Sequence, residues 1–125
     1  MSAATTEPVA LLLCDDLMWT SRVAGTGQAL GFKVVAVPTV EKLEAVARRL
    51  PTTCVILDLA AVKAPTAEIV TRLRAACEVP PRFVAFGSHV DTATLQAARD
   101  AGCDPVLPRS KMAEGLPELL KEWLS

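Results

Sequence analysis

The sequence contains three aspartates at positions where their carboxylates could act together. Asp15 and Asp16 directly follow one apolar run, and Asp58 directly follows another. Carboxylates that lie close together repel one another and need a positive partner. Mg²⁺ suits hard oxygen ligands and usually binds through few carboxylates plus water, and a basic side chain such as Arg109 would also compensate. The three residues therefore predict either a magnesium site or an ion-paired acidic pocket.

The segments around these aspartates indicate an alternation of strands and helices. Short apolar runs bounded by turn residues fit strands that are buried on both faces. Amphipathic stretches between them fit helices. Strands are expected at residues 9–14, 33–37, 53–57, 82–86 and 106–107. Helices are expected at residues 18–30, 40–50 and 66–77, from a cap at Asp91 to Ala101, and at residues 116–124.

This alternation predicts an α/β fold with a parallel sheet. Parallel strands joined by right-handed crossovers place helices on both faces of the sheet. Gly31 and Gly102 follow two of the expected helices and suit helix ends. In such sheets, ligand chemistry gathers at the carboxyl ends of the strands. If their strands are neighbours, the three aspartates meet at that edge.

The bulk properties favour one globular domain that binds neither nucleic acid nor membrane. A chain of 125 residues fits one domain, which we expect at residues 8–125 behind a flexible tail at 1–7. The net charge of −1 offers no basic surplus for nucleic acid or an anionic membrane. No apolar stretch approaches the ~20 residues that span a bilayer. The four cysteines lack zinc-ligand spacing and lie in apolar stretches, as buried free cysteines do. Because the sequence shows no signal-peptide pattern either, we expect a cytoplasmic protein with reduced thiols.

Three stretches together resemble the receiver domain of two-component response regulators. They are LLLCDDL at 11–17, VILDL at 55–59 and GSHVDTATLQAARDAGCDPVLPRS at 87–110, and the resemblance spans nearly the whole chain. It implies the flavodoxin-like, three-layer (βα)5 fold with strand order 2-1-3-4-5. It also implies roles for single residues. Asp15 and Asp16 match the acidic pair that helps to hold Mg²⁺, and the backbone carbonyl of Ala60 matches a further metal ligand. Asp58 matches the phosphoacceptor, which also contacts the metal.

Three positions depart from the receiver pattern. The Thr or Ser after the fourth strand falls on Gly87, with Ser88 beside it, and the Lys after the fifth strand falls on Arg109. The aromatic residue that rotates during switching is replaced by Val106. Gly87 has no hydroxyl for a phosphoryl oxygen, and a one-residue offset along a strand would turn the Ser88 side chain to the other face. Arg109 keeps the charge of Lys but differs in reach and shape. We therefore expect the pocket to keep its phosphoacceptor chemistry, and the conformational relay from the pocket to the far surface to be lost.

The resemblance implies a stand-alone signalling domain of a phosphorelay and not an enzyme. The implied partners are a histidine kinase or phosphotransfer protein and other signalling proteins, with the chain as a monomer or weak homodimer. By analogy with receivers, the fourth helix, fifth strand and fifth helix would form the interaction face. That face includes Thr94, Gln96, Pro105, Lys111 and Glu118.

Three alternatives stay open. A pseudo-receiver would bind its partner without phosphorylation. A small flavin or nucleotide enzyme on the same fold needs a phosphate-binding loop, and the glycines at 25 and 27 lie inside a helical pattern instead. The segment VILDLAAV at 55–62 also resembles the anti-sigma-factor antagonist domain, but the Asp-Ser pair expected after it is absent.

Overall fold

The computed structural model describes residues 8–125, so the flexible tail predicted for residues 1–7 lies outside the described residues. The strands are β1 (Val9–Leu13), β2 (Lys33–Val37), β3 (Cys54–Asp58), β4 (Arg82–Gly87) and β5 (Val106–Pro108). They form one parallel sheet in the order β2-β1-β3-β4-β5, which confirms the predicted fold class and strand order.

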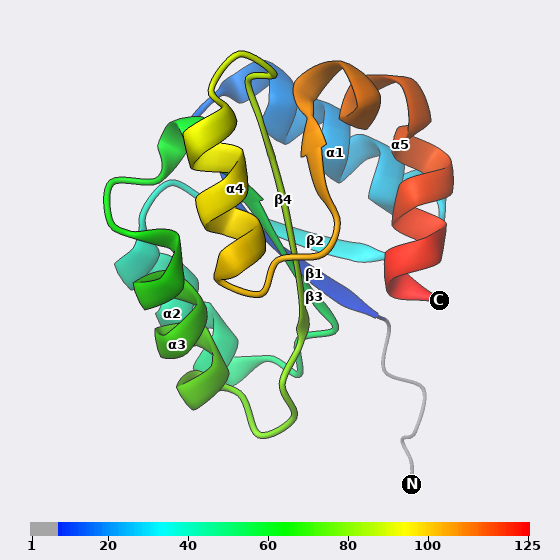
Figure 1. The fold of residues 1–125 in the computed structure, drawn as a ribbon. Helices are drawn as coiled ribbons and strands as arrows, with labels where there is room; N and C mark the ends of the chain where they lie inside the picture. The colour runs from blue at the N-terminus through cyan, green and yellow to red at the C-terminus, as the bar shows by residue number, and fades with distance from the viewer. Residues whose placement is uncertain (1–7) are drawn as a thin grey trace, which may run out of the picture.

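Helices cover both faces of this sheet (Figure 1). They are α1 (Leu17–Ala29), α2 (Val40–Arg49), α3 (Thr66–Ala76), α4 (Thr92–Asp100) and α5 (Arg109–Leu124), with a short 3₁₀ helix η1 (Leu59–Ala61) after β3. None of these helices is long and apolar enough to span a membrane.

The alternation of side chains along each strand divides the core into two clusters. Along β1, Leu11 and Leu13 pack with α2, α3 and α4, whereas Ala10 and Leu12 pack with α1 and α5. β1 and β3 are buried along their whole length. The carboxyl ends of these two central strands therefore lie between helices on both sides of the sheet.

Glycines shape two helix ends and one helix contact. Gly31 and Gly102 have φ of +85° and +106° just beyond α1 and α4, where the sequence predicts helix ends. α1 runs unbroken through Gly25 and Gly27. A Cβ added at Gly27 would lie 2.5 Å from Cγ2 of Val34, so a glycine is needed for α1 to approach β2 this closely.

The prediction for the last helix was wrong at its start. The sequence placed this helix at residues 116–124, whereas α5 begins at Arg109. Its first half packs Met112 fully into the core, and the helix bends at Gly115, where φ is −111° and ψ is 17°. Pro117 follows this bend, in the first turn of the second half. The Pro117 signal therefore marked an interruption inside the helix and not its beginning.

Candidate functional site

Asp58 ends the central strand β3 and is almost completely buried, with 1% of its surface exposed. Its side chain caps η1, because Oδ1 accepts a hydrogen bond from the backbone N–H of Ala60 at 3.0 Å. β1 and β4 flank β3 on either side. A buried carboxylate needs hydrogen bonds or a cation to offset its lost hydration, and the surrounding groups supply both.

The thiol of Cys14 provides the partner for the second carboxylate oxygen. Cys14 directly follows β1, is 3% exposed, and donates to Oδ2 of Asp58 over 3.3 Å. Burial raises the pKa of this thiol, although the Asp16 backbone and the Thr20 side chain act in the opposite direction. The sequence pattern around Cys14 indicates only a buried free cysteine, and this contact was not predicted. The sequence did contain a hint of this contact, because Cys14 ends the strand that was predicted to lie next to the strand of Asp58.

Arg109 faces Asp58 from the start of α5. Its Nη2 lies 3.5 Å from Oδ1 of Asp58, and its side chain is 37% exposed while that of Asp58 is 2% exposed. The guanidinium therefore reaches from the protein surface to a buried carboxylate. Arginine suits this position because it stays charged and presents several N–H groups to an oxyanion.

Asp15 and Asp16 are exposed at the same edge of the sheet. Asp16 is the N-cap of α1, where Oδ1 accepts from the backbone N–H groups of Met18 and Trp19 at 2.9 and 3.2 Å. An aspartate ahead of a helix is itself a capping signal. One of the two Asp16 oxygens is therefore already committed to the helix.

The described side chains do not form a ready metal site. Among residues 8–125, no three His, Cys, Asp or Glu side chains are grouped closely enough to hold one metal ion. Oδ1 of Asp58 is engaged by the Ala60 N–H and Arg109, and Oδ2 by Cys14. In this conformation, the positive partner of Asp58 is the guanidinium of Arg109.

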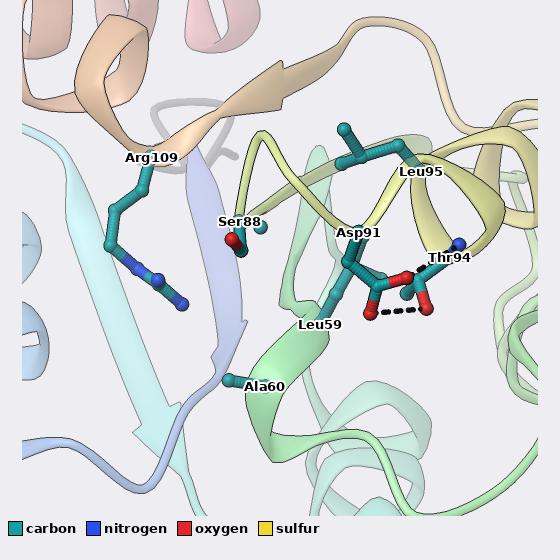
Figure 2. Close-up of a pocket in the computed structure, with 8 residues that line it drawn as sticks. Leu59, Ala60, Ser88, Asp91, Thr94, Leu95 and Arg109 are labelled. Carbon is teal, nitrogen blue, oxygen red and sulfur yellow. Dashed lines mark hydrogen bonds between the residues drawn. The ribbon is translucent and has the colours of Figure 1, made fainter.

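A cavity of about 130 Å³ lies beside Asp58. It is lined by residues of η1, the end of β4, α4 and the start of α5: Leu59, Ala60, Gly87, Ser88, Asp91, Thr94, Leu95 and Arg109. Figure 2 shows Arg109 extending toward Ser88 and Ala60 on one side, with Asp91 and Thr94 paired on the other. The hydroxyl of Ser88 accepts a hydrogen bond from the N–H of Val90 at 3.4 Å. Because β4 ends at Gly87, the strand alternation no longer applies to Ser88, and its side chain lines the same cavity as Arg109.

Two residues that depart from the receiver pattern are closely packed. A Cβ added at Gly87 would lie 3.3 Å from Cβ and Cδ1 of Leu59 and 3.5 Å from Cδ2 of Leu95. Val106 is 7% exposed and belongs to the core cluster on the side of α2, α3 and α4. Neither position holds a group that can reach an anion bound at Asp58.

Comparisons with known proteins find similarity in structure and not in sequence. No family model matches the chain, and no curated protein matches it. A response regulator from Thermotoga maritima has a TM-score of 0.79 at 15% identity, over 95% of this chain and 98% of that one.

Two further structures are similar over nearly the whole chain. The receiver domain of a sensor histidine kinase from Pseudomonas aeruginosa, with magnesium in its active-site cleft, has a TM-score of 0.77 at 16% identity, covering 95% of this chain and 98% of that one. The receiver domain of a Saccharomyces cerevisiae response regulator, solved with a histidine phosphotransfer signalling protein, has a TM-score of 0.77 at 12% identity, covering 94% and 89%. The chain therefore has the fold of response-regulator receiver domains.

Proposed function

We propose that the protein is a receiver-like signalling domain that acts through contacts with other proteins, with Asp58 as its phosphoacceptor. The observation that carries this proposal is the buried carboxylate of Asp58 at the carboxyl end of β3, facing Arg109 at 3.5 Å across the edge of a small cavity. The receiver fold supports it. In open α/β sheets, this edge is where ligand chemistry takes place.

The transfer would use groups that are already in place. A carboxylate oxygen of Asp58 attacks the phosphorus of a phosphohistidine, so an O–P bond forms as the P–N bond breaks. The electron pair returns to the imidazole, which takes up a proton. Arg109 offers N–H groups to the phosphoryl oxygens, and Ser88 lines the same cavity. The Mg²⁺ ligands expected at Asp15, Asp16, Asp58 and Ala60 stay a prediction.

The partner that delivers phosphate would approach the edge that carries Asp58. Leu17 and Met18 are each 83% exposed in the first turn of α1, and Val90 is 74% exposed in the loop between β4 and α4. Both segments adjoin strand ends at this edge. These apolar side chains fit contact with a histidine kinase or phosphotransfer protein.

A second interaction face is proposed for output. On the α4, β5 and α5 side, Gln96, Lys111 and Glu118 are exposed, whereas Thr94 and Pro105 are half-buried. Thr94 also bonds Asp91, and Gln96 bonds Asp100. The exposed residues of this set are therefore better candidates for partner contacts.

A constitutive pseudo-receiver is the second candidate function. The contact between Arg109 and Asp58 favours it, because the guanidinium already balances the carboxylate in the absence of phosphate. The crowding at Gly87 also favours it, because a hydroxyl-bearing side chain there would press against Leu59. Such a domain would bind its partner in one conformation.

Intact mass measurement separates the two candidates. The wild type is incubated with a small phosphodonor such as phosphoramidate, with and without Mg²⁺, beside Asp58→Asn and a control, Asp104→Asn, at an exposed position before β5. A phosphoacceptor gains the mass of one phosphoryl group in the wild type and the control but not in Asp58→Asn. No gain in the wild type would identify a pseudo-receiver, and an equal gain in Asp58→Asn would place the phosphate elsewhere.

A further inference from the structure

The thiol of Cys14 lies at the inner end of a short chain of polar contacts. Asp16, the N-cap of α1, follows Cys14 by two residues. The thiol proton can reach Oδ2 of Asp58 at 3.3 Å or the backbone carbonyl of Asp16 at 3.6 Å. The shorter contact is also the one with a carboxylate, which makes the stronger bond. The thiol therefore connects α1 to the carboxylate at the end of β3.

The donors around Asp58 are divided between its two oxygens. Oδ1 receives the Ala60 N–H and faces Arg109. Oδ2 receives only the thiol among the described hydrogen bonds to this side chain. The terminal torsion of an aspartate is broad and roughly two-fold. Because the two oxygens are equivalent, a donor fixed at one of them sets the orientation of the carboxylate plane toward the cation.

We propose that Cys14 is a positioning residue for Asp58. By holding Oδ2, its thiol presents Oδ1 to Arg109 and to the incoming phosphoryl group. This inference rests on the proposed role of Asp58 as phosphoacceptor. Without the thiol, Oδ2 would be buried with no donor, and the carboxylate would turn to recover one. Arg109 would then face a carboxylate that only the Ala60 N–H holds in place.

Cys54 provides a matched control for the sulfur atom itself. It belongs to the same apolar cluster as Cys14 and is 0% exposed. Burial raises its pKa to about 12. It begins β3 four residues before Asp58, which is about 13 Å along a strand. Replacing Cys54 therefore removes a buried sulfur without touching the carboxylate.

The first test measures the rate of mass gain from phosphoramidate in the wild type, Cys14→Val, Cys14→Ser and Cys54→Ala. Cys14→Val keeps an apolar side chain but loses the donor, and we expect its rate to fall about tenfold, the size of one net hydrogen bond. Cys14→Ser keeps a donor and should stay within about threefold of the wild type. Cys54→Ala should match the wild type. Equal rates in Cys14→Val and Cys54→Ala would overturn the proposal.

The second test does not depend on phosphorylation. The S–H stretching band of Cys14 is assigned by infrared difference between the wild type and Cys14→Ser. We expect Asp58→Ala to shift this band to higher frequency, because the thiol loses its acceptor. If the wild type takes up no phosphate, the proposed function fails, and the infrared band alone decides whether Cys14 holds the carboxylate. An unshifted band would overturn the positioning role even if phosphorylation occurs.

Discussion

The two halves of the pocket are built in opposite ways. Around Asp58, each carboxylate oxygen has a donor, from Ala60, Arg109 or Cys14, and the side chain is almost completely buried. Beside it lies a cavity of about 130 Å³ that is lined by Gly87, Ser88 and Arg109, and of these three only Arg109 contacts the carboxylate. The donors around Asp58 hold its charged side chain in place. The cavity beside Gly87 leaves space in which a conformational switch would act.

Restoring a hydroxyl at Gly87 should cost the most. In Gly87→Thr, the new Cβ would meet Leu59 at 3.3 Å and Leu95 at 3.5 Å, on a buried strand end. Overpacking of this kind typically costs about 1–3 kcal/mol. We expect that loss in the free energy of unfolding, measured with urea. Gly87→Thr combined with Leu59→Ala should recover part of the loss relative to Leu59→Ala alone.

The outcome at Gly87 also tests the contrast between the two halves. If Gly87→Thr did not lower the stability, Leu59 and Leu95 would be able to move aside. Packing would then not be what excludes a hydroxyl-bearing side chain from this position. Gly25→Ala offers a comparison within a helix, since nothing lies within 4 Å of a Cβ added there. That substitution should leave stability unchanged or raise it by up to about 1 kcal/mol.

Removing the cation should cost somewhat less. Arg109→Ala leaves the buried carboxylate of Asp58 with only the Ala60 N–H and the Cys14 thiol as donors. Because Arg109 is partly exposed, water can replace it, and we expect a loss of about 1–2 kcal/mol in the free energy of unfolding. The control Arg99→Ala, at an exposed position on α4, should stay within about 0.5 kcal/mol of the wild type. Equal effects of the two substitutions would show that the contact with Asp58 does not contribute to the free energy of unfolding.

A divalent cation should compete with Arg109 for the same carboxylate. We expect Arg109→Ala to bind Mg²⁺ about tenfold more tightly than the wild type, the result of removing one nearby positive charge. Calorimetric titration of both proteins measures the difference. Asp58→Asn in the Arg109→Ala background serves as the control and should lose the gain. An unchanged Mg²⁺ affinity in Arg109→Ala would show that Mg²⁺ does not compete with Arg109 for the carboxylate of Asp58.

The strands and the position of Asp58 followed from the sequence because their signals are local, whereas the order of the sheet followed from the resemblance to receiver domains. An apolar run of five residues that stops at an aspartate specifies both a buried strand and its end. Most expected boundaries differ from the structure by only a residue or two, as at Cys14 and Thr53, which fall just outside β1 and β3. The start of α5 was missed because Gly115 and Pro117 are strong local signals for the end or the start of a helix. The burial of Met112, which holds the first half of α5 against the core, is a tertiary effect.

The fine structure of the site depended on contacts that no sequence pattern records. The thiol of Cys14 meets Asp58 because β1 and β3 are adjacent, 44 residues apart along the chain. Asp16 was assigned to a metal on the strength of the family resemblance, while its local role as a helix cap is equally readable from its place before α1. The contact between Cys14 and Asp58, in contrast, appears only once β1 and β3 are packed together.

The smallest expected effect is the response to a phosphoryl mimic, and it is the sharpest test of the contrast. A ligand shifts a conformational equilibrium only by its differential affinity for two states. Here Arg109 already faces Asp58, Gly87 offers no hydroxyl, and Val106 is a packed core residue with no ring to rotate. We therefore expect beryllofluoride to shift amide NMR signals only around Asp58, Ser88 and Arg109. Large shifts that reach Val106 and the far half of α5 would show that the open half of the pocket does transmit the signal. In that case Ser88, which already lines the cavity, would be the first hydroxyl to replace, by Ser88→Ala.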